Sequence, residues 1–145
     1  METIVRIQNE SEYNEILRQA VAVIENARSN AARAIVSTSN EMHWRIGQLL
    51  YERKLEKEHG ASVVKHLSVD LKHRYPDMGM SERNLWDMKR FYVRFRQSSP
   101  KLRQTVAVLP WWNINKLISK LGDDDEAILY YAEQTVAKRW GRDLM

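Results

Sequence analysis

Apolar residues recur every three or four positions along most of this chain, which is the period of an amphipathic α-helix. The longest such pattern covers residues 11–58 and contains no proline. Ser11 begins it as a candidate N-cap, and Gly60 follows it as a candidate C-terminal stop. One unbroken helix of this length would extend for about 70 Å. The pattern therefore predicts either a long helix that packs against another chain or a helical hairpin that bends at the polar run Ser37–Asn40.

Shorter helical patterns follow, over residues 62–75, 81–96, 113–121 and 124–138. Ser81 begins the second of them, Gly122 ends the third, and Asp123 or Asp124 begins the last. The segments QSSPKLRQ and AVLP are predicted as a loop and a short extended piece, and WGRDLM as the start of a further element. No segment alternates apolar and polar residues as a strand does. We therefore expect an all-α fold, with one compact domain over residues 1–145 and about six helices.

The composition limits the cellular compartment of the protein and the reactive groups that its side chains offer. The chain has no cysteine, so it forms no disulfide and offers no thiolate as nucleophile or metal ligand. Its first residues are acidic where a signal peptide needs a basic region, and no apolar run approaches the ~20 residues of a membrane helix. We expect a soluble cytoplasmic protein that does not enter a membrane.

The position of the positive charge suggests a partner. The formal net charge is +4, and residues 80–103 alone hold seven Lys and Arg against two Asp and Glu. A local cluster of this kind is typical of a surface that binds a polyanion such as DNA. The alternative is a solvated helix face without a partner.

The helices over residues 62–75 and 81–96, with a turn between them, have the order of a helix-turn-helix unit. In such a unit the N-terminal residues of the second helix meet base edges in the major groove. Helical spacing divides that helix into an inward face of Leu85, Met88, Tyr92 and Phe95 and an outward row of Arg83, Asp87, Arg90 and Arg94. The alternative for the outward row is a surface salt-bridge ladder.

The candidate DNA contacts follow from this division. The residues expected to face bases are Ser81, Arg83, Asn84 and Asp87, because Arg can grip guanine and Asn can grip adenine. The residues expected to hold phosphates are Lys72, Arg74, Lys89, Arg90, Arg94 and Lys101.

No pattern supports catalysis or a cofactor. Pro76-Asp77 and Asp87-Met88-Lys89 match a nuclease PD…DxK signature formally, but one carboxylate falls in a turn and the other in a helix, so we attribute the match to chance. His59, His66 and His73 are seven residues apart, about 10.5 Å along a helix, which is too far for one metal ion. We therefore assign no catalytic residue, metal ligand or cofactor.

The five tryptophans are candidates for base stacking or for the core. We expect Trp44, Trp111 and Trp140 in the core, because large aromatic residues dominate the burial of small domains. Trp86 and Trp112 are the pair expected to face a partner.

Several segments together resemble one family. They are HWRIG (43–47), HGASVVKHLSVDLKHRYPDMGMSERNLWDMKRFY (59–92), LPWW (109–112), YYAE (130–133) and KRWGRDL (138–144). In this order they resemble the N-terminal domain of the YhcG-type bacterial proteins, from about Tyr13 to the end of the chain. The resemblance implies a helical domain that binds DNA and precedes a PD-(D/E)xK nuclease domain. The catalytic residues of that nuclease would lie beyond Met145, outside this chain.

Two functions remain as hypotheses. The first is a non-catalytic DNA-binding module that positions the nuclease domain on its substrate. The second is an oligomerisation or protein-docking domain of the same system, in which the helix over residues 11–58 forms a homodimer because it is too long for its own core. The two are compatible, since helix-turn-helix proteins often bind as dimers.

Overall fold

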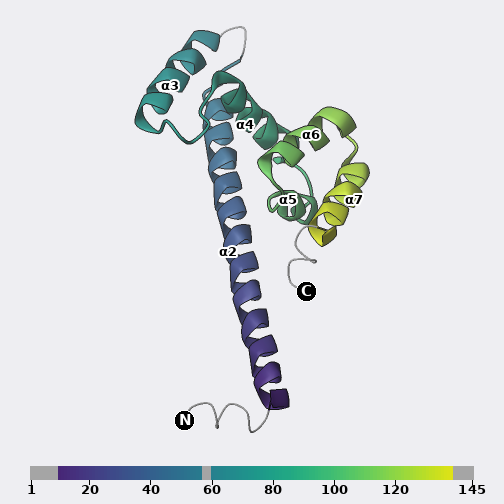
Figure 1. The fold of residues 1–145 in the computed structure, drawn as a ribbon. Helices are drawn as coiled ribbons and strands as arrows, with labels where there is room; N and C mark the ends of the chain where they lie inside the picture. The colour runs from purple at the N-terminus through teal and green to yellow at the C-terminus, as the bar shows by residue number, and fades with distance from the viewer. Residues whose placement is uncertain (1–9, 57–59, 139–145) are drawn as a thin grey trace.

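The computed structural model describes residues 10–56 and 60–138, which contain six helices and no strand. The helices are α2 (Glu10–Glu52), α3 (Ala61–Arg74), α4 (Glu82–Phe95), α5 (Pro100–Val106), α6 (Trp111–Leu121) and α7 (Asp125–Val136). The predicted all-α fold is confirmed. Figure 1 shows α2 as a long rod, with α3 and α4 at its C-terminal end and α5, α6 and α7 on one side of it. No helix in the described ranges is both long and apolar enough to cross a membrane.

Helix α2 is continuous over 43 residues and does not bend at the polar run Ser37–Asn40. Asn40 is buried, and its Nδ2 donates hydrogen bonds to the carbonyl oxygens of Ala107 and Leu109, both at 2.8 Å. The polar run therefore fastens α2 to the connection between α5 and α6, so the hairpin alternative is wrong.

The predicted ends of α2 need correction. Ser11 lies inside the helix, whose described part begins at Glu10. The helix ends at Glu52, before Gly60, because the backbone turns at Lys54 with a φ of 58°. Gly60 instead precedes α3 as its N-cap.

Helix α4 joins two hydrophobic clusters. Leu85 and Met88 belong to one cluster with residues of α2 and α3. Phe91 and Phe95 belong to the other, with residues of α5, α6 and α7. Phe91 is 3% exposed and takes the core place that the spacing gave to Tyr92, which is half-buried. Nearly every face of α4 is therefore covered by protein.

Helix α5 occupies part of the segment predicted as a loop, and no extended piece follows it. The Ser99 side chain accepts a hydrogen bond from the backbone N–H of Leu102, and Pro100 occupies the first turn. Serine followed by proline is a strong helix start, because the proline lacks an N–H that would go unpaired there. The prediction missed this signal in a helix of only seven residues.

Ser81, Gly122 and Asp124 mark helix boundaries as predicted, whereas α6 begins at Trp111, two residues before its predicted start at residue 113. Ser81 and Asp124 accept hydrogen bonds from the backbone N–H groups of Asn84 and Ala127, and Gly122 ends α6 with a φ of 56°. The segment WGRDLM lies outside the described residues.

The backbones of α2 and α4 approach each other closely at Gly47. A Cβ atom on Gly47 would lie 2.0 Å from the carbonyl oxygen of Met88 and 2.6 Å from its carbonyl carbon. Both are backbone atoms of α4 and cannot move aside as a side chain could. The absence of a side chain at Gly47 therefore sets how closely the two helices pack.

We expect Gly47→Ala to lower the free energy of unfolding by about 1–3 kcal/mol, because one methyl group must push α4 away from α2. The measurement is the denaturant midpoint, followed by circular dichroism. Gly122→Ala is the matched control: nothing lies within 4 Å of its Cβ, so its cost comes only from the positive φ. Equal unfolding curves for Gly47→Ala and wild type would contradict the close contact.

His43 lies on the same face of α2 as Asn40 and is buried with it. Its ring lies 4.0 Å from that of Trp111, centroid to centroid, and its Nδ1 is 3.3 Å from Asn40 Oδ1. Burial lowers the pKa of His43 to about 4. His43 is therefore neutral in the folded protein at neutral pH.

The depressed pKa predicts a pH-dependent stability. The unfolded chain binds the His43 proton below about pH 6.5, and the folded protein only below about pH 4. The stabilisation is therefore fully present above about pH 6.5 and is lost as the pH falls toward 4, with a total of at most about 3 kcal/mol. We expect His43→Gln to have a flatter dependence of unfolding free energy on pH between 6.5 and 4.5 than wild type. Parallel curves would show that His43 does not titrate differently in the two states.

Candidate nucleic-acid interface

The unit of α3, turn and α4 has a fixed geometry. Gly79 adopts a φ of 66° in the turn, which favours glycine. Ser68 of α3 donates a hydrogen bond from its Oγ to the carbonyl oxygen of Met80 at 2.7 Å, and Met80 is buried. The turn is thereby held against α3.

Two predicted base-reading residues have structural partners. Ser81 caps α4. Asn84 donates from Nδ2 to the carbonyl oxygen of Gly79 at 2.6 Å, and its Oδ1 accepts from Trp111 Nε1 at 2.7 Å. The Asn84 amide therefore joins the turn to α6, and a contact with adenine would require breaking those bonds.

The outward row of α4 does not point into solvent along its whole length, so this part of the prediction is wrong for Arg90 and Arg94. Arg90 lies 3.2 Å from Ser119 Oγ of α6 and 3.7 Å from the carboxylate of Asp87. Arg94 donates from Nε to the carbonyl oxygen of Gly122 at 2.7 Å. Helical spacing could not show that α6 and the start of α7 would pack on this face.

Ion pairs neutralise further cations of the basic cluster. Arg94 pairs with Asp125 at 2.6 Å, and its side chain is 12% exposed. Lys89 is equally buried, pairs with Glu56 at 3.0 Å and donates to the carbonyl oxygen of Leu55. Lys101 pairs with Glu133 at 3.5 Å. With Arg90, four of the seven basic residues in 80–103 thus have a carboxylate partner.

The remaining predicted cations are exposed. Lys72, Arg74 and Arg83 lie at the end of α3 and the start of α4. None of them has a carboxylate within 4.0 Å among residues 10–56 and 60–138. Arg83 also lines a groove of about 450 Å³ between α4 and α6, together with Trp112 and Lys116. These side chains are therefore open to solvent.

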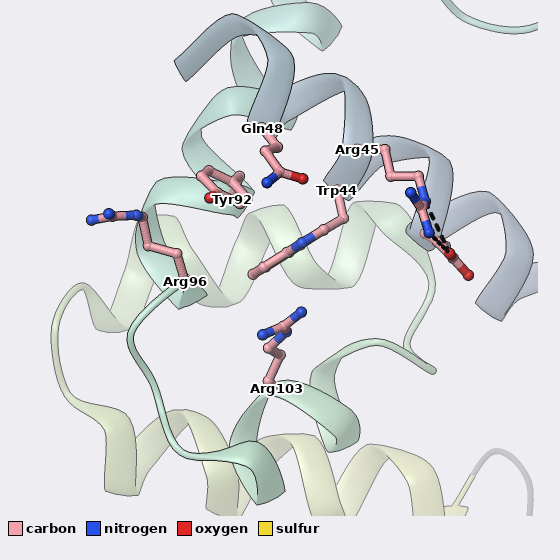
Figure 2. Close-up of a pocket in the computed structure, with 7 residues that line it drawn as sticks. Trp44, Arg45, Gln48, Tyr92, Arg96 and Arg103 are labelled. Carbon is pink, nitrogen blue, oxygen red and sulfur yellow. Dashed lines mark hydrogen bonds and ion pairs between the residues drawn. The ribbon is translucent and has the colours of Figure 1, made fainter. Parts of the chain in front are cut away.

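A second cleft, of about 420 Å³, lies between α2, the end of α4 and α5. Trp44 and Gln48 come from α2, and Tyr92 comes from α4. Arg96 is the C-cap residue of α4, and Arg103 comes from α5. Figure 2 shows the Trp44 ring in the middle of this cleft, with the Arg103 guanidinium on one side of it.

Arg96 and Arg103, the two arginines that line the cleft with Trp44, differ in their contacts from most residues of the basic cluster. The Arg103 guanidinium lies 4.2 Å from the Trp44 ring centroid, and that of Arg96 lies 4.7 Å from the Tyr51 ring centroid. In the described part of the chain, neither guanidinium has a carboxylate or a hydrogen-bond acceptor. Arg45 at the rim instead pairs with Glu41 at 2.9 Å. The ring contacts therefore orient Arg96 and Arg103 and leave their N–H groups for a ligand.

Arg96 and Arg103 were not among the residues predicted to bind DNA. Both belong to the counted basic cluster, which was the signal that could have indicated them. They were not predicted as contacts because neither belongs to the outward row of α4: Arg96 follows the end of α4, and Arg103 lies in α5. Trp44 lies on a different helix, so only the fold brings it to Arg103.

The tryptophans divide partly as predicted. Trp44 and Trp111 pack against the core. Trp112 is 61% exposed, as expected for a partner-facing residue. Trp86 is half-buried against the cluster around Leu85, so only part of its surface is open to a partner. Trp140 lies outside the described residues.

A comparison with protein-family models gives a match to the DUF1016 N-terminal domain over residues 19–145. The chain belongs to this family. It is the YhcG-type N-terminal domain that the sequence motifs indicated. No curated protein and no solved structure matches the chain. Within the described ranges, this DUF1016 N-terminal domain also has no group of three His, Cys, Asp or Glu residues placed to hold a metal ion.

The contacts of α4 predict which arginines stabilise the domain. We expect Arg94→Gln to lower the free energy of unfolding by about 1 kcal/mol, since it removes a shielded ion pair and a hydrogen bond to a backbone carbonyl. Arg83→Gln, on the same helix and with the same loss of charge, should change it by less than about 0.5 kcal/mol. Chemical denaturation of both variants is the measurement, and equal effects would argue against the assigned contacts of Arg94.

Proposed function

We propose that this DUF1016 N-terminal domain is a non-catalytic nucleic-acid-binding module, which holds a PD-(D/E)xK nuclease domain on its DNA substrate. The observation that carries the proposal is the exposure of Arg96 and Arg103, together with the contacts that they make. They are exposed and oriented by aromatic rings, and no carboxylate among the described residues neutralises them. An arginine in this state offers a planar set of N–H donors to a phosphate.

The cleft fits a sugar-phosphate backbone better than a stacked base. Arg103 already lies over the ring of Trp44, so that face of the indole is occupied. Gln48 and Tyr92 add polar groups that can donate to phosphate or sugar oxygens. We therefore assign phosphate contacts to Arg96 and Arg103.

The exposed cations at the α3–α4 corner form the second part of the proposed interface. Lys72 and Arg74 remain proposed phosphate contacts. Arg83, which was predicted to face bases, stays exposed and is added as a further proposed phosphate contact. The other predicted contacts have partners within the protein, so the proposal does not depend on them: Ser81, Asn84, Asp87, Lys89, Arg90, Arg94 and Lys101.

We expect duplex DNA to bind with an affinity whose logarithm falls linearly with log salt concentration, with a slope of about −4.5 for five phosphate contacts. The double variant Arg96→Gln/Arg103→Gln should bind more weakly and flatten the slope by about 2, because two contacts are lost. The measurement is fluorescence anisotropy of a labelled duplex over a salt series, with a single strand of the same sequence in parallel.

The matched control is Lys65→Gln/Lys120→Gln, which removes the same charge from exposed positions of α3 and α6 outside the proposed interface. It should leave the slope within about half a unit of wild type. Absence of binding at low salt, or equal weakening by the cleft variant and the control, would refute the proposed interface.

A further inference from the structure

The N-terminal half of α2 carries an apolar stripe that no other part of the described chain covers. Its large members are exposed: Tyr13, Ile16, Leu17, Val21, Val23, Ile24 and Ile35 are each between 47% and 67% accessible. The alanines at 20, 27 and 31 are exposed between them. Figure 1 shows this half of α2 extending away from the other helices. So large an apolar surface on a helix is typical of a protein–protein interface.

The stripe faces away from the body of the domain. Asn40 marks the side of α2 that contacts the body, because it is bonded to Ala107 and Leu109. At 100° per residue, Tyr13 and Ala31 lie about 180° around the helix axis from Asn40. The α5–α7 group therefore cannot cover the stripe without a rotation of α2.

The spacing of the stripe is that of a coiled coil. Tyr13, Leu17, Ala20, Ile24, Ala27 and Ala31 follow one another at steps of four, three, four, three and four. These are the alternating a and d positions of a heptad, with Leu17, Ile24 and Ala31 at a. Every d position after Tyr13 in this run is alanine. A partner helix must therefore fit a seam in which large and small residues alternate.

A second copy of the same helix fits this seam in one orientation. In an antiparallel pair, a residues of one helix meet d residues of the other. The register that places Ala20 opposite Ile24 of the second copy also places Leu17 opposite Ala27 and Tyr13 opposite Ala31. All six layers then combine one large residue with one alanine, which keeps the helices at a constant and close distance. A parallel pair would instead stack like with like and alternate wide and narrow layers.

The charges favour the same orientation. Glu10 and Arg28 are the charged residues between positions 10 and 36 that lie on the seam side of α2, each about 60° from the seam. An antiparallel pair brings Glu10 of one helix toward Arg28 of the other, whereas a parallel pair brings each of them beside its own copy.

We propose that two copies of this chain associate through the N-terminal halves of α2 as an antiparallel pair centred between Ala20 and Ile24. The paired region spans about 27 Å of helix, from Tyr13 to Ala31. The two crossings of α2 with α4 would then lie about 75 Å apart along the pair. The dimer therefore presents two copies of the clefts at opposite ends, and this inference does not depend on whether they bind DNA.

The chain has no cysteine, so engineered thiols report the register without background. We expect Leu17→Cys protein mixed with Ala27→Cys protein to form a disulfide between chains under mild oxidation, because the two positions lie opposite each other. Leu17→Cys protein alone should not, since its two copies are about 15 Å apart along the axis. A disulfide in Leu17→Cys protein alone, with no disulfide between a Leu17→Cys chain and an Ala27→Cys chain in the mixture, would overturn the antiparallel register.

The pairing of one large residue with one alanine in each layer provides a second test. The measurements are multi-angle light scattering and sedimentation of the full chain. Ile24→Ala should weaken the dimer by a factor of ~30 or more, because two layers lose their large member. The swap Ala20→Ile/Ile24→Ala exchanges the two sizes across each layer and should restore the wild-type dissociation constant to within about tenfold.

Ile24→Asp should give a monomer of unaltered helicity. The matched control is Ala22→Asp, which places the same charge on the opposite side of the helix from the seam and should leave the dimer unchanged. A wild-type chain that stays monomeric at high concentration would overturn the proposal and assign the stripe to a different partner. Failure of the size swap to restore the dimer would refute the register. Neither outcome bears on the DNA-binding measurements.

Discussion

The contact between α2 and α4 at Gly47 is the constraint on which the rest of the domain depends. A Cβ there would overlap the backbone of Met88, so the two helices can approach only because the side chain is missing. Helix α4 then serves both hydrophobic clusters: Leu85 and Met88 pack against α2 and α3, and Phe91 and Phe95 pack against α5, α6 and α7. Displacement of α4 would therefore disturb both clusters at once.

Polar contacts fix how these helices are placed relative to one another. Asn40 bonds to two carbonyl oxygens between α5 and α6, Asn84 bonds to the indole of Trp111, and Arg94 bonds to the end of α6. Each contact joins elements far apart in the sequence, and an unpaired buried amide would be costly. The same contacts use side chains that a helix-turn-helix protein would offer to DNA. The accessible positive charge consequently shifts from the middle of α4 to the corner around Arg83 and to the cleft around Arg103.

Much of the secondary structure could be predicted, because helix periodicity and caps are local. Ser81, Gly122 and Asp124 end or begin helices as their side chains and backbone preferences require. Helix α5 was missed because seven residues give too little periodicity, although Ser99 and Pro100 marked its start. The candidate site was harder to predict. Four of the basic residues have carboxylate partners, three of them at distant positions, and Trp44 reaches Arg103 across 59 positions of the chain.

The sequence by itself determined the all-α class, the positions of most helices, the family and the basic character of residues 80–103. It also held the alternation of large residues and alanines along α2, which is a local pattern. Only the tertiary structure decided that α2 is unbroken, which face of it stays uncovered, and which arginines remain free. Those outcomes depend on which helices pack together, and packing joins residues whose separation along the chain carries no periodic signal.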